Sequence, residues 1–195
     1  MELRIQEDSL DRLDEHARIP IAFMVQRILA VSTPDSGLGG VVLTEAAVET
    51  PWVKDYDAIK GEGPTRWPKR FDTSSWGLIA AHEGVDRVGG AVIAFDSPEV
   101  HMLGGRSDTA ALWDLRVRPD ARRSGIGSAL FLAVESWCRQ RGCHILTVET
   151  QNINLPACRF YVRMGCSLGS INRHAYPDFP DETQLVWSKG LRPQP

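Results

Sequence analysis

The fold of this chain depends on residues 111–165, ALWDLRVRPDARRSGIGSALFLAVESWCRQRGCHILTVETQNINLPACRFYVRMG. Residues 111–117 predict a strand, because the run is short and apolar and Pro119 follows it. A glycine loop then opens a helix that ends before Gly142. Apolar side chains recur at helical spacing in that helix, at Ile126, Leu130, Ala133, Val134 and Trp137. The first half of the stretch therefore predicts strand, loop and helix.

The second half of the stretch repeats this order without the loop. Residues 144–150 predict a second strand, and Asn154 is a typical N-cap for a short helix that ends at Gly165. Apolar residues of that helix are Ala157, Phe160, Tyr161 and Met164. Together the two halves indicate a mixed α/β domain.

The loop at residues 122–128, RRSGIGS, has the composition of an anion-binding site. A glycine loop that opens a helix presents free backbone N–H groups at the positive end of the helix dipole. Gly125 and Gly127 allow a ligand close to the backbone. Leu130 stands where a dinucleotide loop needs a third glycine, and no Gly-Lys pair marks a nucleotide P-loop. An ordinary capped turn is the alternative interpretation.

Two motifs resemble the GCN5-related N-acetyltransferases. The R-x-x-G-x-G sequence at residues 122–127, after a strand that ends in Leu-x-Val-x-Pro, resembles the loop that binds the pyrophosphate of acetyl-CoA in that family. Val148-Glu149-Thr150 with Asn154, Ala157 and Tyr161 is similar to its L-E-V…N-x-x-A-x-x-x-Y pattern. The resemblance covers roughly residues 75–190. The strings ETQNINLPACRFY and PWVKDYD resemble the streptothricin acetyltransferase-like branch.

The resemblance implies one N-acetyltransferase domain over residues 1–195, with residues 1–74 as an N-terminal, substrate-side portion. The implied fold is α/β, with a mixed, mostly antiparallel, splayed sheet flanked by helices. The implied co-substrate is acetyl-CoA, and no metal is required. Dimers are common among similar proteins, so the resemblance leaves a homodimer open.

The resemblance also implies catalytic residues. A primary alkyl amine has a pKa of about 10.4, so an acceptor amine must lose a proton before it attacks. Glu149 matches the glutamate that serves as base in related ribosomal-protein alanine acetyltransferases, and Tyr161 matches the tyrosine that protonates the CoA sulfur. The alternatives are a carboxylate that only binds the ammonium group or pairs with an arginine, and a tyrosine that only packs in the core.

The expected binding residues fall into three groups. The backbone of the first strand is expected to pair with pantetheine through Leu115, Arg116 and Val117. The loop is expected to hold the pyrophosphate through Arg122, Arg123, Ser124, Gly125, Ile126, Gly127 and Ser128, with Asn154 as a further cofactor contact or an N-cap. The candidate substrate residues are Asp114, which is also the second choice for the base and is expected to face away from Trp113, and Tyr56 and Asp178.

Elsewhere the sequence predicts short strands and connections. Strands are expected over residues 1–6, 41–44, 76–82, 87–95, 167–174 and 183–188, and a loop over residues 97–109. Residues 19–32 are compatible with a strand or a helix, because their apolar run has no decisive period. Residues 50–69 contain three prolines and are expected to form a long connection. Arg116 and Arg118 are explained equally well by a solvated face.

Composition limits the function classes. The formal net charge of −3 gives no electrostatic reason to expect a nucleic-acid partner. The charged start MELRIQEDSLDRLDEH lacks a signal peptide's apolar region, and no apolar run approaches a membrane span, so we expect a cytoplasmic protein without a membrane partner. The four cysteines form no C-x-x-C pair and are expected to be reduced thiols.

The leading hypothesis is an acetyl-CoA-dependent N-acetyltransferase that acts on a small cationic amine. A streptothricin-type antibiotic is its sharpest form, because the acidic segments 55–57 and 178–182 are suited to a polycation. One alternative is a protein N-terminal or lysine acetyltransferase. A non-enzymatic alternative is an acetyl-CoA-binding sensor module.

Overall fold

The computed structural model describes residues 2–191, which form two compact units. The first unit contains residues 2–21, 55–148 and 189–191 of the described chain. The second unit contains residues 22–54 and 149–188. Each unit is built from segments that are distant in sequence, so neither could be delimited by a single cut in the chain.

The first unit is organised around a mostly antiparallel sheet. Its strands lie in the order β1 (Leu3–Asp8), β4 (Gly77–Glu83), β5 (Asp86–Ala94) and β6 (Thr109–Val117), each antiparallel to the next. β7 (Ile145–Gln151) begins in this unit and pairs in parallel with β6. The mixed, mostly antiparallel α/β fold is therefore confirmed.

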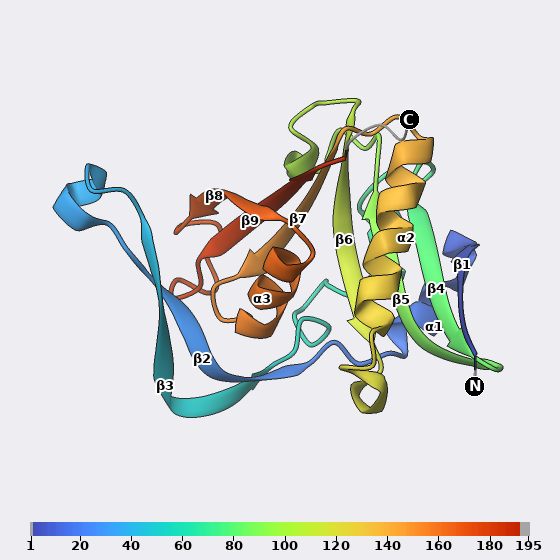
Figure 1. The fold of residues 1–195 in the computed structure, drawn as a ribbon, viewed down its shortest axis with the longest axis horizontal. Coiled ribbons are helices and arrows are strands. Elements are labelled where there is room, and N and C mark those ends of the chain that lie inside the picture. The colour runs from blue at the N-terminus through green and yellow to red at the C-terminus, as the bar shows by residue number, and fades with distance from the viewer. Residues whose placement is uncertain (1, 192–195) are drawn as a thin grey trace. The chain divides into compact units, whose positions relative to one another are not determined.

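Helices cover both faces of this sheet. α2 (Ile126–Gln140) lies along β4, β5 and β6 (Figure 1). A Cβ atom at Gly89 would meet Leu130 and Ile126 of α2, whereas one at Gly90 would meet His16 of α1 (Leu13–Ala17). Neighbouring residues of a strand point to opposite faces, so α1 and α2 pack on opposite sides of the sheet.

A large hydrophobic cluster supports β6 on the α1 side. Leu13 of α1, Trp67 and Trp76 belong to it, together with Leu78, Val92, Ala94, Val100, Leu103 and Ala111. The Trp113 ring packs against this cluster, with its centroid 5.2 Å from that of Phe71 and 5.3 Å from that of Trp76. The aromatic side chains of this cluster therefore act as core.

The second unit combines a hairpin with a smaller strand group. β2 (Phe23–Ser32) and β3 (Val42–Lys54) form a long antiparallel hairpin (Figure 1). The end of β7 is followed in the sheet by β9 (Gln184–Gly190) and β8 (Ser167–Asn172), and α3 (Leu155–Arg163) connects β7 to β8. The buried Asn152 joins both parts, because its amide donates to Leu29 O at 3.0 Å and its Oδ1 accepts from Thr183 N at 2.8 Å.

Most predicted elements are confirmed, and two expectations change. Residues 23–32 form a strand, which resolves the ambiguity over residues 19–32. The long connection begins only after Lys54, because β3 continues to that residue instead of ending at Thr44. The pairing with β2 passes from Arg27↔Ala47 to Val25↔Trp52, and this bulge accommodates Pro51. The proline therefore interrupts the ladder without ending the strand.

None of the helices within residues 2–191 has both the length and the apolar composition needed to cross a membrane.

Candidate functional site

The end of β6 has one edge that β7 does not cover. β6 pairs with β5 as far as Val117, but its described pairing with β7 covers only Thr109–Leu112. The N–H of Arg118 donates to Val88 O of β5 at 2.8 Å. Because N–H groups alternate along a strand, those of Leu115 and Val117 point to the other edge. These groups are suited to pair with an extended, amide-containing ligand.

The same alternation changes the expectation for Arg116. Arg116 lies opposite Gly90, and its backbone N–H and C=O groups point toward β5. These groups are therefore not directed at the open edge. Its side chain is only 1% exposed, so the interpretation of a solvated face is wrong for Arg116. The backbone contacts of Leu115 and Val117 with a cofactor therefore remain a prediction that fits the open edge, whereas the backbone of Arg116 faces β5.

The glycine loop leads directly from this edge to the start of α2. Arg123 and Gly125 have positive φ angles of 66° and 92°, and Gly125 is the N-cap of the helix. No side chain caps this end of the helix. The first N–H groups of α2 therefore have neither an intrahelical nor a side-chain acceptor; they belong to Ile126, Gly127 and Ser128. Together with the helix dipole they form a potential anion site.

The two loop arginines differ in what they do. Arg122 donates to Val117 O at 3.0 Å and to Pro20 O at 3.1 Å, so its guanidinium ties the loop to the end of β6. Ser124 donates to Ala121 O at 2.6 Å and closes the turn. Arg123 is exposed. Arg122 therefore shapes the loop, whereas Arg123 is available to an anion.

Asp114 lies in a buried ion-pair network of the first unit. Its carboxylate is 2.7 Å from His16 Nε2 and 2.9 Å from Arg116 Nε. Arg116 also forms a bidentate pair with Asp57 at 2.6 and 2.8 Å and donates to Ile19 O at 3.2 Å. The carboxylate is thus enclosed by internal partners. This geometry supports a structural role for Asp114 in place of the expected base or substrate contact.

A β-bulge also changes the expected direction of Asp114. In the pairing with β5, Asp114 lies opposite Val92 and Leu112 opposite Ile93, so Trp113 is an extra residue. Trp113 packs on the cluster that contains Leu13 of α1, while Asp114 reaches His16 of the same helix. The expectation that Asp114 faces away from Trp113 is therefore wrong, because a bulge interrupts strict alternation.

We expect Asp114 to make the first unit sensitive to acid. Burial is the largest influence and raises its pKa, but hydrogen bonds and charges from His16 and Arg116 outweigh burial and lower the pKa from 3.8 to about 2. Stabilisation by a group with a lowered pKa is complete above its ordinary pKa and is lost as the pH falls through the lowered value. Asp114→Asn should reduce stability at neutral pH by about 3 kcal/mol, because Arg116 loses a buried partner. Urea unfolding between pH 7 and pH 2 measures both effects. Parallel pH curves for the two proteins would contradict the acid sensitivity, and equal stability at pH 7 would contradict the loss of the ion pair.

The second unit contains the two expected catalytic residues. Glu149 is half-buried on β7, where its Oε1 accepts from the Tyr176 hydroxyl and its Oε2 from the Gln184 amide, both at 2.6 Å. Tyr161 is buried on α3, with its ring edge-on to Phe160 at 5.2 Å between centroids. Glu149 therefore has polar partners, and it is not paired with an arginine in these contacts.

Asn154 acts as the N-cap of α3. Its Oδ1 accepts from the backbone N–H of Ala157 at 3.2 Å, as the sequence pattern predicts. This capping bond uses the oxygen of the side chain. A contact with a cofactor remains a prediction and would have to use the amide nitrogen or the backbone.

Ion pairs already occupy part of the acidic segments. Asp57 binds Arg116, and Glu182 binds Lys54 at 2.5 Å. Asp178 is exposed. Tyr56 is half-buried, and its own carbonyl accepts a hydrogen bond from Ile59 N in a turn. The capacity of the two segments for a cationic substrate is therefore smaller than their composition suggests.

These features agree with a known family. The sequence model of the acetyltransferase (GNAT) family matches residues 46–166 of this chain, which include β6, the glycine loop, α2, β7 and α3. This chain belongs to the GNAT family. The predicted resemblance is thus confirmed, and its motifs lie on the elements that the sequence indicated.

Relatives of this GNAT chain include streptothricin acetyltransferases. Streptothricin acetyltransferase A of Bacillus subtilis (strain 168) is 32% identical over 80 residues, which are 40% of this chain and 46% of that protein. Streptothricin acetyltransferase of Streptomyces lavendulae is 28% identical over 134 residues, 67% of each chain. The chain spans about half the length of the first Bacillus and Escherichia coli relatives that it matches.

Solved structures share the GNAT fold over nearly the whole chain. Nourseothricin acetyltransferase has a TM-score of 0.76 at 20% identity, with 98% of this chain and 100% of that chain covered. A Bacillus anthracis protein in complex with acetyl coenzyme A has a TM-score of 0.74 at 20% identity, with 97% and 99% covered. At this identity the likeness shows the fold.

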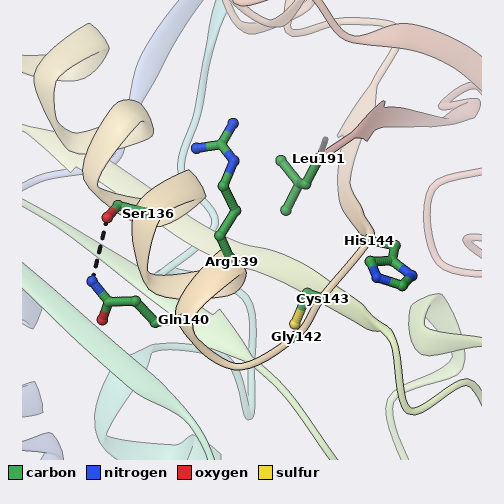
Figure 2. Close-up of a pocket in the computed structure, with 7 residues that line it drawn as sticks. All are labelled: Ser136, Arg139, Gln140, Gly142, Cys143, His144 and Leu191. Atoms are coloured by element: carbon green, nitrogen blue, oxygen red, sulfur yellow. Dashed lines mark hydrogen bonds between the residues drawn. The ribbon is translucent and has the colours of Figure 1, made fainter. Parts of the chain in front are cut away.

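One pocket of this GNAT chain lies away from the glycine loop. A cavity of 380 Å³ lies beside the C-terminal end of α2 (Figure 2). The glycine loop precedes the N-terminal end of the same helix. The lining of the cavity consists of Ser136, Arg139, Gln140, Gly142, Cys143, His144 and Leu191. Within residues 2–191, no group of three or more His, Cys, Asp or Glu side chains is placed to hold a metal ion.

Sequence reasoning missed the partners of the acidic residues in this GNAT chain. His16 lies 98 residues from Asp114, and Tyr176 and Gln184 lie 27 and 35 residues from Glu149. No local spacing links such residues. For Tyr176 the signal is its place in a short connection between two predicted strands, one of which begins beside Gln184.

Proposed function

We propose that this chain is an acetyl-CoA-dependent N-acetyltransferase that acetylates a primary amine of a small cationic substrate, with streptothricin-type antibiotics as the first candidates. The observation that carries the proposal lies in the first unit. The open edge at Leu115 and Val117 continues directly into a glycine loop and an uncapped helix start. Acetyl-CoA combines an amide-containing arm with a pyrophosphate, and these two features match its two parts.

The cofactor contacts divide along the chain. The Leu115 and Val117 backbone pairs with the pantetheine amides, and one of these N–H groups polarises the thioester carbonyl. The N–H groups of Ile126, Gly127 and Ser128 bind the pyrophosphate. Arg123 adds positive charge to this site, while Arg122 holds the loop in place.

The chemistry requires one base and one acid. Glu149 accepts a proton from the substrate ammonium, directly or through water, so that the amine lone pair can attack the thioester carbon. A backbone N–H stabilises the negative charge that forms on the thioester oxygen. The C–N bond forms, the C–S bond breaks, and Tyr161 donates a proton to the departing CoA sulfur. The nitrogen then loses its second proton, which restores the tyrosine hydroxyl directly or through water. The products are the acetylated amine and CoA.

Support for the substrate class comes from the relatives. Streptothricin acetyltransferase of Streptomyces lavendulae is similar to this chain over 134 residues, and nourseothricin acetyltransferase shares the fold. Within the second unit, Asp178 is exposed and carries a negative charge suited to a polyamine-like substrate. The relatives that acetylate the alanine of ribosomal protein bS18 make a protein N-terminus the second candidate acceptor.

A thiol-release assay tests this function. Acetyl-CoA is mixed with the protein and with streptothricin, aminoglycosides, polyamines, free amino acids or short peptides, and mass spectrometry locates the acetyl group. We expect selective turnover of streptothricin. If only the peptides are acetylated, the acceptor is a protein amine and the second candidate replaces the first. If CoA raises the melting temperature while none of these amines reacts, the cofactor site stands, the proposed substrate class is wrong and the acceptor is unknown.

A further inference from the structure

Four polar side chains of the second unit form a connected network around Glu149. The Tyr176 hydroxyl donates to Glu149 Oε1 at 2.6 Å, and the Gln184 amide donates to Oε2 at 2.6 Å. The Gln151 amide contacts the Tyr176 hydroxyl oxygen at 3.1 Å. All four side chains are half-buried. Both oxygens of the carboxylate are thus held by neutral donors.

The direction of these bonds follows from the chemistry of the groups. An ionised carboxylate only accepts hydrogen bonds, so Gln184 must present its NH₂ group and Tyr176 its hydroxyl proton. The Gln151 amide donates to the same hydroxyl oxygen, which directs the hydroxyl proton toward Glu149. Each carboxylate oxygen keeps further lone-pair capacity. Glu149 is therefore oriented without being saturated and can still accept a proton.

The segment that carries Tyr176 is itself fastened within the second unit. Residues 173–183 connect β8 to β9, and Lys54 Nζ binds Glu182 at 2.5 Å and lies 3.5 Å above the Phe179 ring centroid. Thr183 N donates to Asn152 Oδ1 at 2.8 Å. An ordered connection can hold a side chain in one rotamer, which a loose loop cannot do.

We infer that Tyr176 and Gln184 are positioning residues that fix the Glu149 carboxylate for proton transfer, an inference that rests on the proposed function. A carboxylate on a flexible side chain samples several rotamers, and only some place an oxygen where it can meet the ammonium proton. Two donors on the two oxygens select one orientation. This positioning raises the rate of the catalytic step and leaves cofactor binding unchanged, because neither residue belongs to the loop or strand edge proposed to bind CoA.

A double-mutant cycle tests the inference. Tyr176→Phe and Gln184→Leu are each made in the wild-type protein and in Glu149→Gln, and kcat and KM are measured with acetyl-CoA and streptothricin. Gln140→Leu is the matched control, because Gln140 contacts Ser136 on the exposed side of α2. Circular dichroism and melting temperature establish that each variant folds.

We expect Tyr176→Phe and Gln184→Leu each to lower kcat about tenfold, because a hydrogen bond to a charged group is lost. KM for acetyl-CoA stays unchanged, and Gln140→Leu behaves like the wild type. In the Glu149→Gln background the same changes alter the rate by less than about twofold, since there is no longer a carboxylate to position.

Three results would overturn the inference. Equal fold losses in both backgrounds would show that the two residues act only on stability or elsewhere in the site. Wild-type kcat in both single variants would show that Glu149 needs no positioning. A wild-type protein that turns over no amine would overturn the proposed function and the inference together, which distinguishes this failure from the other two.

Discussion

Replacing Glu149 with glutamine is expected to lower kcat/KM for amine acetylation by about 10²–10⁴-fold, the usual contribution of a general base. Glutamine has nearly the same shape, but it cannot accept the proton that the ammonium group must lose. The affinity for CoA should not change, because the strand edge and the glycine loop of the first unit are untouched. Steady-state thiol release measures the rate, and calorimetric titration with CoA measures the affinity.

Two further variants sharpen this result. Glu149→Asp keeps the charge but withdraws the carboxylate by one methylene group, away from Tyr176 and Gln184, and should therefore also lose rate. Glu62→Gln is the matched control, because the Glu62 carboxylate is in a solvent-accessible pair with Arg70, whose loss costs little. Wild-type kinetics in Glu149→Gln would remove Glu149 from the role of base.

Replacing Gly127 with tryptophan is expected to weaken CoA binding at least about 100-fold, or about 2.8 kcal/mol. Gly127 lies in the first turn of α2, whose N–H groups no side chain caps. An indole ring at this position would fill the space that the pyrophosphate needs to reach these groups. Equilibrium binding of CoA, measured by calorimetry, gives the dissociation constants.

Gly127→Ala is the matched control at the same position. Alanine is a better helix former than glycine and adds a single methyl group, so this variant should stay folded and lose far less affinity. The contrast between the two variants isolates steric exclusion from a change in helix stability. A folded Gly127→Trp protein that binds CoA like the wild type would contradict the assignment of the loop.

Much of the fold followed from local signals in residues 111–165. The positive φ of Gly125, the N-cap at Asn154 and the helical spacing after Ile126 are properties of neighbouring residues, and the structure contains each of them. The same holds for Glu149 and Tyr161, whose motif lies on β7 and α3 as the resemblance implied. Their catalytic roles remain predictions.

Other features depended on contacts that no local pattern encodes. The bulge at Trp113 depends on the register with β5, and the length of β3 depends on its pairing with β2. A strand or loop prediction from composition therefore ended β3 too early. Such errors arise because ladder hydrogen bonds join residues that are far apart in the chain.

The sequence by itself determined the family, the order of the central elements and the candidate residues for binding acetyl-CoA and moving a proton. Only the tertiary structure decided which neighbours surround each acidic group. The Asp114 carboxylate is enclosed by His16 and Arg116, which favours a structural role. The Glu149 carboxylate is held by the neutral donors Tyr176 and Gln184, which suits the proposed base. The physical reason is that a carboxylate's reactivity depends on the charge and burial of its neighbours in space, and folding brings those neighbours from distant parts of the chain.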